Sequence, residues 1–202
     1  MDTLSHGLWA TAVAKGVNLK STKKIKLGWM ALWGISPDIF SFAPVIIWML
    51  WQVFYNGVDF ADIPRPETMP PEVRNSFFIF RLTETLYHIS HSFITFFALF
   101  FLAWIMCWYM FKHKSETNTL TYTHYQPSRY TPHWEMTGWL IHIVMDIPTH
   151  SKTFYPTLFL WPLSDWHFDG ISWANMWFII TNYTFLLIVF ILLRFVRKMK
   201  VK

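Results

Sequence analysis

Long apolar runs alternate with short polar segments along the chain, and this pattern predicts membrane-spanning helices. A helix needs roughly 20 apolar residues to cross a hydrocarbon core about 30 Å thick. Three runs reach that length, namely Leu27–Tyr55, Ile89–Phe111 and Asn175–Phe195. A fourth run, Trp134–Ile147, is shorter and ends where Pro148 disfavours helix at the residue before it. The pattern therefore predicts an all-α, polytopic membrane helical bundle of about four transmembrane helices.

Two details modify this bundle. The first apolar run contains Ser36-Pro37-Asp38, which predicts that the first span is a broken helix. Irregular backbone at membrane depth is tolerated only where protein or a wet cavity surrounds it, so we expect the break to lie deep in the bundle. The start of the chain, MDTLSHGLWA, predicts an N-terminal amphipathic helix.

The composition agrees with a membrane location. The 202 residues are 53% hydrophobic, 20% aromatic and only 14% charged, against about 25% charged in an average soluble protein. This length suits a single domain covering residues 1–202. The one cysteine, Cys107, excludes an intramolecular disulfide and a thiolate metal cluster, so any metal must be held by imidazole and carboxylate.

Loop charge predicts the orientation, because cytoplasmic loops collect Lys and Arg. Lys15–Lys26 carries five lysines and no acid, whereas Asn56–Tyr87 has five acids against three arginines. Lys112–His133 is net +2, Thr149–Ala174 is net −1, and the tail from Arg194 adds five basic residues. The alternation predicts cytoplasmic termini at both ends of the chain. We interpret the net charge of +5 as a topology and anionic-lipid signal, and we expect the bilayer and no nucleic acid as a partner.

Candidate chemistry begins in the apolar segment GWLIHIVMDIPTH. His142 and Asp146, at i and i+4, share one helical face and can grip one ion. Ionisable residues inside spans usually face the protein interior and mark function. His150, just past Pro148, could reach back as a further ligand or as a partner that orients one. The alternative is that His142 only makes a hydrogen bond to Asp146 or to a neighbouring helix.

Other segments repeat this pattern. In ETLYHISHSF, His88 and His91 are spaced i and i+3, which places them on one face of a helix. Asp38 lies in an apolar run, where an unpaired carboxylate would be costly, and His6 lies near the N-terminus. Four separate segments thus supply a His or Asp where apolar residues would be expected, which indicates an assembled site.

The order of these motifs resembles a known family. LSHGLWA, ISPDIF, HISHSF, HIVMD and LFLWPLSD follow one another as in the YdjM-type family of bacterial inner-membrane metal-dependent hydrolases. The resemblance spans about residues 1–170 and rests on the order of the motifs. It implies a bacterial inner-membrane location and the metal ligands His6, Asp38, His91, His142 and Asp146.

One motif departs from the family. The family often has HRGxTHS, whose first histidine falls on Leu86 in this chain. Either His88 substitutes from a nearby position, or this chain binds fewer ions.

Three imidazoles and two carboxylates suit one or two divalent ions, with Zn²⁺ first and Mn²⁺ or Fe²⁺ as alternatives. Such an ion makes hydroxide available at neutral pH. The sequence therefore predicts a membrane-embedded hydrolase of a phosphoester or lipid-linked substrate, with His88 or His150 assisting proton transfer. The alternative is a non-enzymatic membrane protein, either a divalent-metal carrier or a scaffold whose buried polar groups fix helix packing. The pattern indicates no particular oligomeric state.

Overall fold

The computed structural model describes residues 1–202 except 65–68, 118–133, 153–154 and 202. The described part contains helices and no strands, which confirms the all-α prediction. Most of the polar connection Lys112–His133 lies outside the described residues. The α-helices are α1 (Thr3–Asn18), α2 (Leu27–Phe54), α3 (Pro71–Ser76), α4 (Phe78–Ser90), α5 (Phe93–Thr117), α6 (Thr137–Asp146) and α7 (Met176–Val201), with 3-10 turns at Phe60–Asp62 and Trp134–Met136.

Three helices are long and apolar enough to cross a membrane: α2, the Phe93–Met110 part of α5, and the Met176–Met199 part of α7. They indicate a membrane protein whose apolar helices contact lipid, and α5 and α7 expose most of their apolar side chains. The predicted fourth span is not one of them. Helix α6 has only ten residues, which at 1.5 Å per residue extend about 15 Å, half of a hydrocarbon core.

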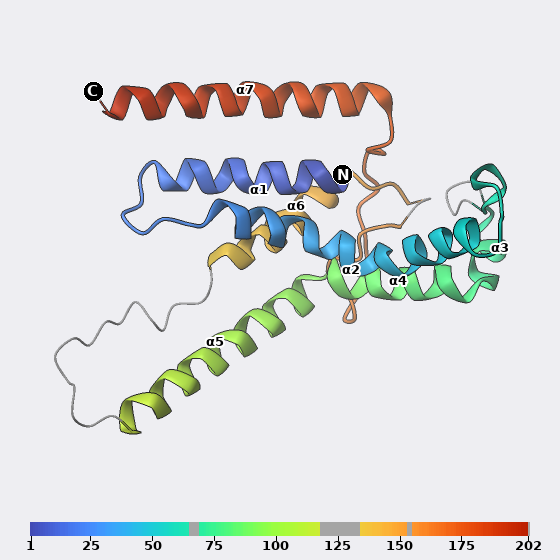
Figure 1. The fold of residues 1–202 in the computed structure, drawn as a ribbon, viewed down its shortest axis with the longest axis horizontal. Helices are drawn as coiled ribbons and strands as arrows, with labels where there is room; N and C mark the ends of the chain where they lie inside the picture. Colours follow the sequence, from blue (N-terminus) through green and yellow to red (C-terminus); the bar gives the residue numbers. More distant parts are fainter. Residues whose placement is uncertain (65–68, 118–133, 153–154, 202) are drawn as a thin grey trace.

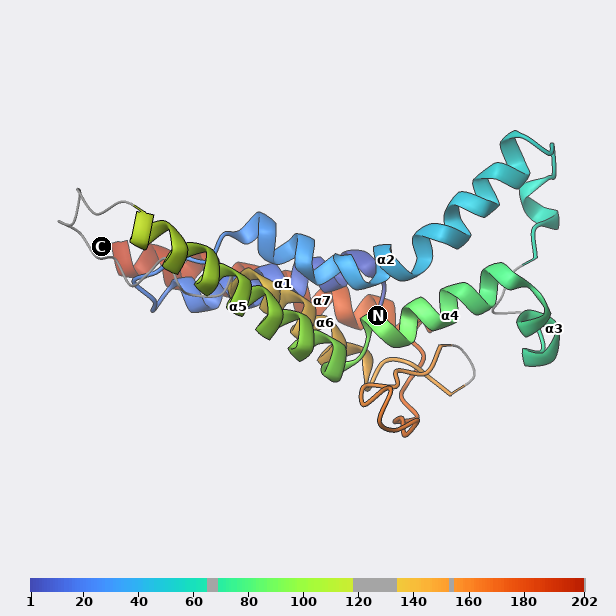
Figure 2. The same ribbon diagram turned by 90° about the horizontal axis from the view of Figure 1, so that it is seen from below.

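Helix α2 is continuous through the predicted break. It contains Pro37 and Pro44, and Figure 2 shows that it bends along its length. A proline inside a helix removes one backbone hydrogen bond and kinks the helix without ending it. Asp38 therefore projects from an unbroken helix, and no break is needed to bring it into the bundle.

Small residues allow α1 to pack closely on the first half of α2 (Figure 1). Ala10 and Ala14 of α1 are fully buried against Met30, and Ala10 lies beside Gly34 of α2. The predicted N-terminal helix is thus present. Its outward side carries apolar residues such as Leu4, so it does not present a polar face to water.

Helix α7 lies along α1 on the side away from α2 (Figure 1). Two side-chain hydrogen bonds fix this contact. Trp9 Nε1 donates to Asn182 Oδ1 over 2.8 Å, and the Tyr183 hydroxyl donates to Asp2 Oδ1 over 2.7 Å. These bonds hold the start of α1, and with it the N-terminus, against the start of α7.

The second half of α2 and α4 form an arm that α3 closes at its far end (Figure 2). Helix α4 runs back along α2 and stops at Ser90, after which the chain turns into α5. Figure 1 shows α5 leaving the bundle at an angle. The junction between α4 and α5 therefore lies at the middle of α2, beside the end of α6.

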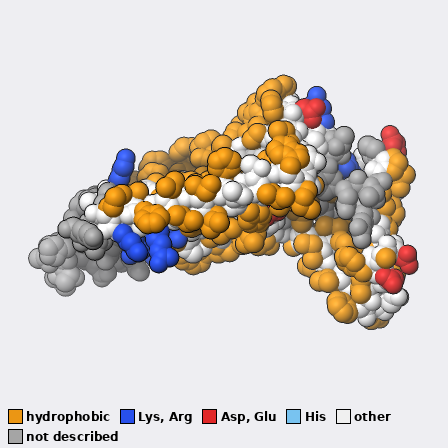
Figure 3. All heavy atoms as spheres, turned by 90° about the horizontal axis from the view of Figure 1, so that it is seen from above, with side chains coloured by type: hydrophobic (Ala, Val, Ile, Leu, Met, Phe, Trp, Pro, Cys, Tyr) orange, Lys and Arg blue, Asp and Glu red, His pale blue; other side chains and the backbone are white. Residues whose placement is uncertain are grey.

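Charge is distributed unevenly along the molecule. On the face in Figure 3, most Lys and Arg side chains gather toward the end that carries the α1–α2 connection and the C-terminus, and acidic side chains gather at the opposite end. The N-terminus lies beside the start of α7, away from the C-terminus, and Met1 is buried. The predicted cytoplasmic location of both termini stays a prediction.

A close approach of α6 to α2 can be tested at Gly138. A methyl group there would fall within contact distance of the Met30 carbonyl oxygen and 3.0 Å from the Gly34 nitrogen, both of them backbone atoms. We expect Gly138→Ala to destabilise the detergent-solubilised protein by about 1–3 kcal/mol, because the helices must separate. Thermal and denaturant unfolding would measure the loss.

Gly28 provides the control, because a methyl group there meets nothing within 4 Å. Gly28→Ala should be neutral or stabilising by up to about 1 kcal/mol, since alanine favours helix. Equal effects of the two substitutions would contradict the close approach.

Candidate metal centre

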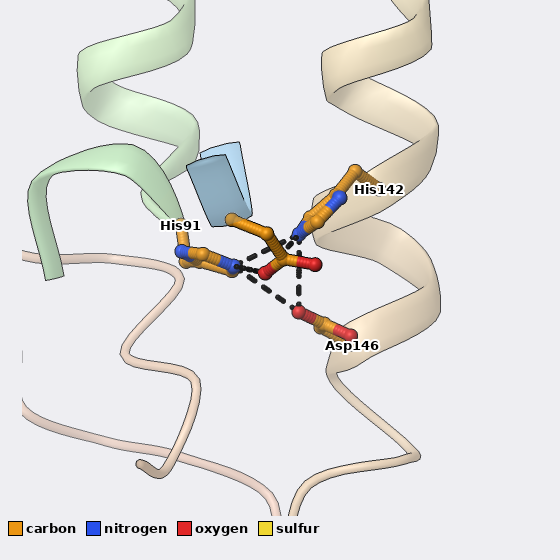
Figure 4. Close-up of side chains that lie close together, drawn as sticks. His91, His142 and Asp146 are labelled. Atoms are coloured by element: carbon orange, nitrogen blue, oxygen red, sulfur yellow. Dashed lines mark hydrogen bonds and ion pairs between the residues drawn. The ribbon is translucent and has the colours of Figure 1, made fainter. Parts of the chain in front are cut away.

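Three parts of the chain bring four ligating side chains together. Asp38 comes from α2, His91 from the residue that ends α4, and His142 and Asp146 from successive turns of α6. All four are buried, and one ligand atom of each lies within 4.8 Å of the others. Figure 4 shows His91, His142 and Asp146 pointing toward one another. The group could hold a divalent metal ion.

The spacing of these atoms is regular. The two Nε2 atoms of His91 and His142 are 2.9 Å apart. Asp38 Oδ1 lies 3.6 Å from His91 Nε2 and 3.5 Å from His142 Nε2. Asp146 Oδ2 lies 3.2 and 3.3 Å from the same two nitrogens. The two carboxylates thus flank the same pair of imidazole nitrogens.

A backbone hydrogen bond fixes the tautomer of His142. Its Nδ1 lies 2.7 Å from the carbonyl oxygen of Gly34. A carbonyl only accepts, so Nδ1 carries the proton and donates it. In the neutral ring the lone pair is then on Nε2, which faces the centre of the group.

A chain of hydroxyl groups fixes His91 in the same way. Its Nδ1 lies 2.8 Å from Ser90 Oγ and 3.0 Å from the Tyr87 carbonyl oxygen. The Ser41 hydroxyl donates to the Pro37 carbonyl, so Ser41 Oγ accepts the proton of Ser90 over 2.7 Å. Ser90 Oγ is then free to accept from His91 Nδ1. The Nε2 lone pair of His91 also faces the centre of the group.

The group therefore presents two lone pairs and two carboxylates to one point, with no donor among them when both rings are neutral. Asp146 Oδ2 is buried and has no hydrogen-bond partner among the described residues. Facing acceptors repel one another, and unpaired buried charge is expensive. Either a cation at the centre or protonation of a ring relieves this repulsion, and the imidazole and carboxylate donors suit a divalent metal.

His6 approaches Asp146 from the opposite side. Its ring stacks on His142 with the centroids 3.6 Å apart, and its Nε2 lies 2.9 Å from Asp146 Oδ1. Neither ring nitrogen makes a hydrogen bond of acceptable geometry with a described residue. Burial, with a smaller contribution from the nearby His142, lowers the pKa of His6 to about 4, although Asp146 opposes the shift. His6 is therefore neutral at pH 7 and can offer a lone pair to an ion.

The N-terminal ammonium group of Met1 pairs with Asp146 Oδ1 and donates to Thr149 Oγ1 over 3.0 Å. Asp146 thus divides its two oxygens between different partners. Oδ2 faces His91 and His142, and Oδ1 faces the ammonium group and His6. This arrangement positions the carboxylate at the centre of the whole cluster.

His150 lies at the edge of the cluster. Its Nε2 is 3.4 Å from Asp146 Oδ1. Its Nδ1 is 3.0 Å from the Tyr155 carbonyl and 3.2 Å from the Tyr87 hydroxyl. The Tyr155 carbonyl fixes the proton on Nδ1, so the Nε2 lone pair faces the cluster. The geometry is that of a base directed toward the centre.

His88 does not join the cluster. The sequence placed it on one helical face with His91, but α4 ends at Ser90 and His91 has non-helical backbone angles. Among the described residues no hydrogen bond or ion pair links His88 to the four ligating side chains. Partial burial lowers the pKa of His88, whereas Glu84 and Asp165 oppose that shift. The role in proton transfer predicted for His88 therefore has no geometric support here.

Sequence reasoning missed the groups that orient the ligands. The Gly34 carbonyl and the Ser41–Ser90 pair come from apolar runs where single small residues carry no signal. Tyr87 could have been noticed, because it lies four residues before His91 and its ring stacks on the His91 ring at 3.7 Å. The contact of the Met1 ammonium group with Asp146 could not be predicted from the sequence pattern.

Comparisons with known proteins were made at the level of family, sequence and structure. The chain matches no protein-family model, no curated protein and no solved structure. The assignment of this site therefore rests on its own geometry.

If the group holds a divalent ion, the ion should stabilise the fold. A ligand at a hundredfold excess over its dissociation constant adds about 2.7 kcal/mol, or a rise in Tm of about 5–10 °C for a chain of this size. We expect chelator-treated protein to regain this Tm when Zn²⁺ or Mn²⁺ is added. Differential scanning calorimetry in detergent would measure the shift.

Asp38→Asn should abolish that metal-dependent rise, because it removes one anionic ligand without changing the volume of the side chain. Asp165→Asn, at an exposed position, is the matched control and should keep the rise. A rise of equal size in both variants would place the ion elsewhere.

Proposed function

We propose that the protein is a membrane-embedded, metal-dependent hydrolase that binds Zn²⁺ through Asp38, His91, His142 and Asp146. The observation that carries this proposal is the convergence of two imidazole lone pairs and two carboxylates on one buried point. The order of the sequence motifs, which resembles the YdjM-type hydrolases, supports the same reaction class.

The spacing of the ligand atoms is compatible with zinc. In a tetrahedral site with bonds of 2.0–2.1 Å, neighbouring ligand atoms lie about 3.3–3.4 Å apart. The five separations given above range from 2.9 to 3.6 Å and are centred on that value. Calcium prefers six to eight oxygen ligands at longer distances, which two imidazoles do not provide. Manganese and ferrous iron are the alternative occupants.

A divalent ion with an open position lowers the pKa of bound water to about 7 and so supplies hydroxide at neutral pH. Four protein ligands would close a tetrahedral zinc site, whereas catalytic sites keep one position open. Asp146 is the ligand that could leave a bound ion and so open a coordination position. Its Oδ1 already has partners outside the group, in the Met1 ammonium and His6, so the carboxylate is held even when Oδ2 withdraws.

His150 is the residue that we propose as general base. Its Nε2 lone pair lies 3.4 Å from Asp146 Oδ1, at the edge of the cluster. A water molecule bound beside the cluster could give its proton to Nε2. The Tyr155 carbonyl would then keep the Nδ1 proton in place while the ring carries charge.

The surrounding surface favours an amphiphilic substrate. Helices α2, α5 and α7 expose large apolar side chains over most of their length, and α2 also supplies Asp38 to the cluster. A substrate with a lipid chain would reach the site from the bilayer. We therefore propose a phosphoester or another lipid-linked ester as the substrate class.

The competing function is a helix-packing scaffold or a divalent-metal carrier. A scaffold fits the closed set of four ligands, because structural zinc sites are closed. Unlike the proposed hydrolase, neither a scaffold nor a carrier would hydrolyse an ester, and this difference can be measured.

The first test is elemental analysis together with an activity screen of the detergent-purified protein. We expect about one equivalent of zinc in the wild type and none in a His142→Ala, Asp146→Ala variant that elutes as a folded species. The wild type should hydrolyse a chromogenic phosphodiester or a lipid phosphoester, and the variant should not. Bound zinc without hydrolysis of any ester tested would favour the scaffold, and no zinc after reconstitution would reject the metal site.

The second test separates the two histidines for which the sequence predicted a catalytic role. We expect His150→Gln to lower kcat by about 10²–10⁴-fold, the usual contribution of a general base, while zinc content stays at the wild-type level. His88→Gln should change kcat by less than about twofold. The opposite ranking would return the role of the base to His88.

A further inference from the structure

A buried positive charge lies outside the metal cluster, in the arm formed by α2, α3 and α4. Arg74 of α3 is only 7% exposed, and its Nε has no hydrogen-bond partner among the described residues. Its ion pair with Glu84 of α4 is long, with 4.0 Å between Nη2 and Oε1. Burying a guanidinium group with such weak pairing is costly, so this arrangement leaves capacity for an anion.

A second donor without a partner comes from the neighbouring residue of Glu84. The hydroxyl of Thr83 is fully buried and makes no hydrogen bond within the described part of the chain. Thr83 precedes Tyr87 by four residues, so the two side chains lie on the same face of α4. Buried hydroxyl groups are nearly always hydrogen-bonded in proteins, which makes this exception informative.

Tyr155 connects this region to the metal cluster. The guanidinium carbon of Arg74 lies 5.5 Å from the centre of the Tyr155 ring. The Tyr155 ring is 5.6 Å from the Tyr87 ring, which in turn stacks on His91 at 3.7 Å. The positive charge is therefore two aromatic rings away from a proposed metal ligand.

The backbone of Tyr155 is in an unusual conformation. Its φ is +44°, in the left-handed region that residues other than glycine rarely adopt. Its ring is 1% exposed, and its carbonyl accepts the Nδ1 proton of His150. Such strain persists only where the surroundings hold the residue, and it is common at ligand-binding sites.

We propose that Arg74 and Thr83 form an anion subsite that binds a phosphate group of the ligand, separate from the metal centre. Arginine suits this role because its planar guanidinium group can donate two parallel hydrogen bonds to phosphate oxygens. The separation from His91 assigns the subsite to a part of the ligand that does not react. The inference rests on the proposed function for its link to a substrate but not for the binding itself.

Among the described residues, Glu84 is the acidic group that pairs with Arg74. It competes with an anion for the guanidinium, and at 4.0 Å it does so weakly. Neutralising it should therefore tighten anion binding. If the Arg74–Glu84 ion pair is purely structural, neutralising Glu84 should lower stability and leave the affinity for anions unchanged.

The experiment uses chelator-treated protein in detergent, so that no metal contributes to anion binding. Thermal unfolding is followed while inorganic phosphate is added. In a second arm, the probe is a mixed micelle of phosphatidylcholine and phosphatidate. A rise in Tm with inorganic phosphate identifies a subsite open to free phosphate, and a rise with phosphatidate alone identifies a lipid headgroup as the source.

We expect Arg74→Gln to weaken the apparent affinity at least about tenfold, as for other hydrogen bonds to charged groups. Glu84→Gln should strengthen it. Arg81→Gln, at an exposed position of α4, is the control and should match the wild type. Equal affinities of wild type and Arg74→Gln, or no response to either probe, would overturn the proposal.

Two further variants keep the test decisive if Arg74→Gln does not fold. Arg74→Lys retains the charge but loses the planar pair of donors, and should bind phosphate more weakly than the wild type. Thr83→Val retains the shape and removes the hydroxyl. If the Thr83 hydroxyl is only an unpaired core group, the variant should be as stable as the wild type or more stable. If the hydroxyl binds the anion, the variant should also lose anion affinity. Because no metal is present, a negative result here leaves the zinc measurement unaffected, and the reverse also holds.

Discussion

Electrostatic repulsion among four buried acceptors is the constraint on which the rest of the structure depends. Asp38, His91, His142 and Asp146 come from three segments far apart in the sequence and meet away from water. In a low-dielectric interior this repulsion is stronger than at a surface. The Met1 ammonium group offsets part of the charge at Asp146 Oδ1, and a cation or an added proton at the centre would offset the rest. The bundle is therefore organised around this polar cluster as much as around apolar packing.

The packing of small residues and the tautomers of the histidines depend on each other. Gly34 provides the carbonyl that fixes His142, and this carbonyl is reachable because Gly138 brings α6 against α2. On the other side, the Ser41 hydroxyl spans from α2 to Ser90, which accepts from His91. Both imidazoles are thus oriented by the backbone or by hydroxyl groups of α2 and α4. A shift of α2 by part of a turn would disturb both rings together.

The sequence predicted the helical class, three of the four expected spans and the residues that meet, because each of these leaves a local signal. Apolar length marks a span, and a His or Asp within an apolar run marks a buried polar group. These local signals failed where tertiary contacts determine the conformation of the backbone. Pro37 suggested a broken helix, but packing against α1 and α4 keeps α2 continuous. The i and i+3 spacing of His88 and His91 suggested a shared face, but the helix ends between them.

The groups that orient the ligands could not be predicted from the local sequence, because they act through tertiary contacts. Tyr87, Gly34 and Ser41 act through a ring face, a carbonyl and a hydroxyl, and nothing in their own neighbourhoods requires those roles. Arg74 shows the same limit. In the sequence it is one of three arginines in an acidic segment, and only the fold reveals that it is buried without a strong partner.

Metal binding and catalysis make different demands on Asp146, and this difference bears on the choice between hydrolase and scaffold. A structural site gains most when all four ligands stay fixed, because each bond adds to the stability of the fold. A catalytic site needs one ligand that can withdraw without leaving a bare buried charge. Asp146 meets that second demand, since the Met1 ammonium, Thr149 and His6 surround its other oxygen. These partners would hold the carboxylate in place if Oδ2 withdrew, which is the behaviour that the proposed hydrolase requires.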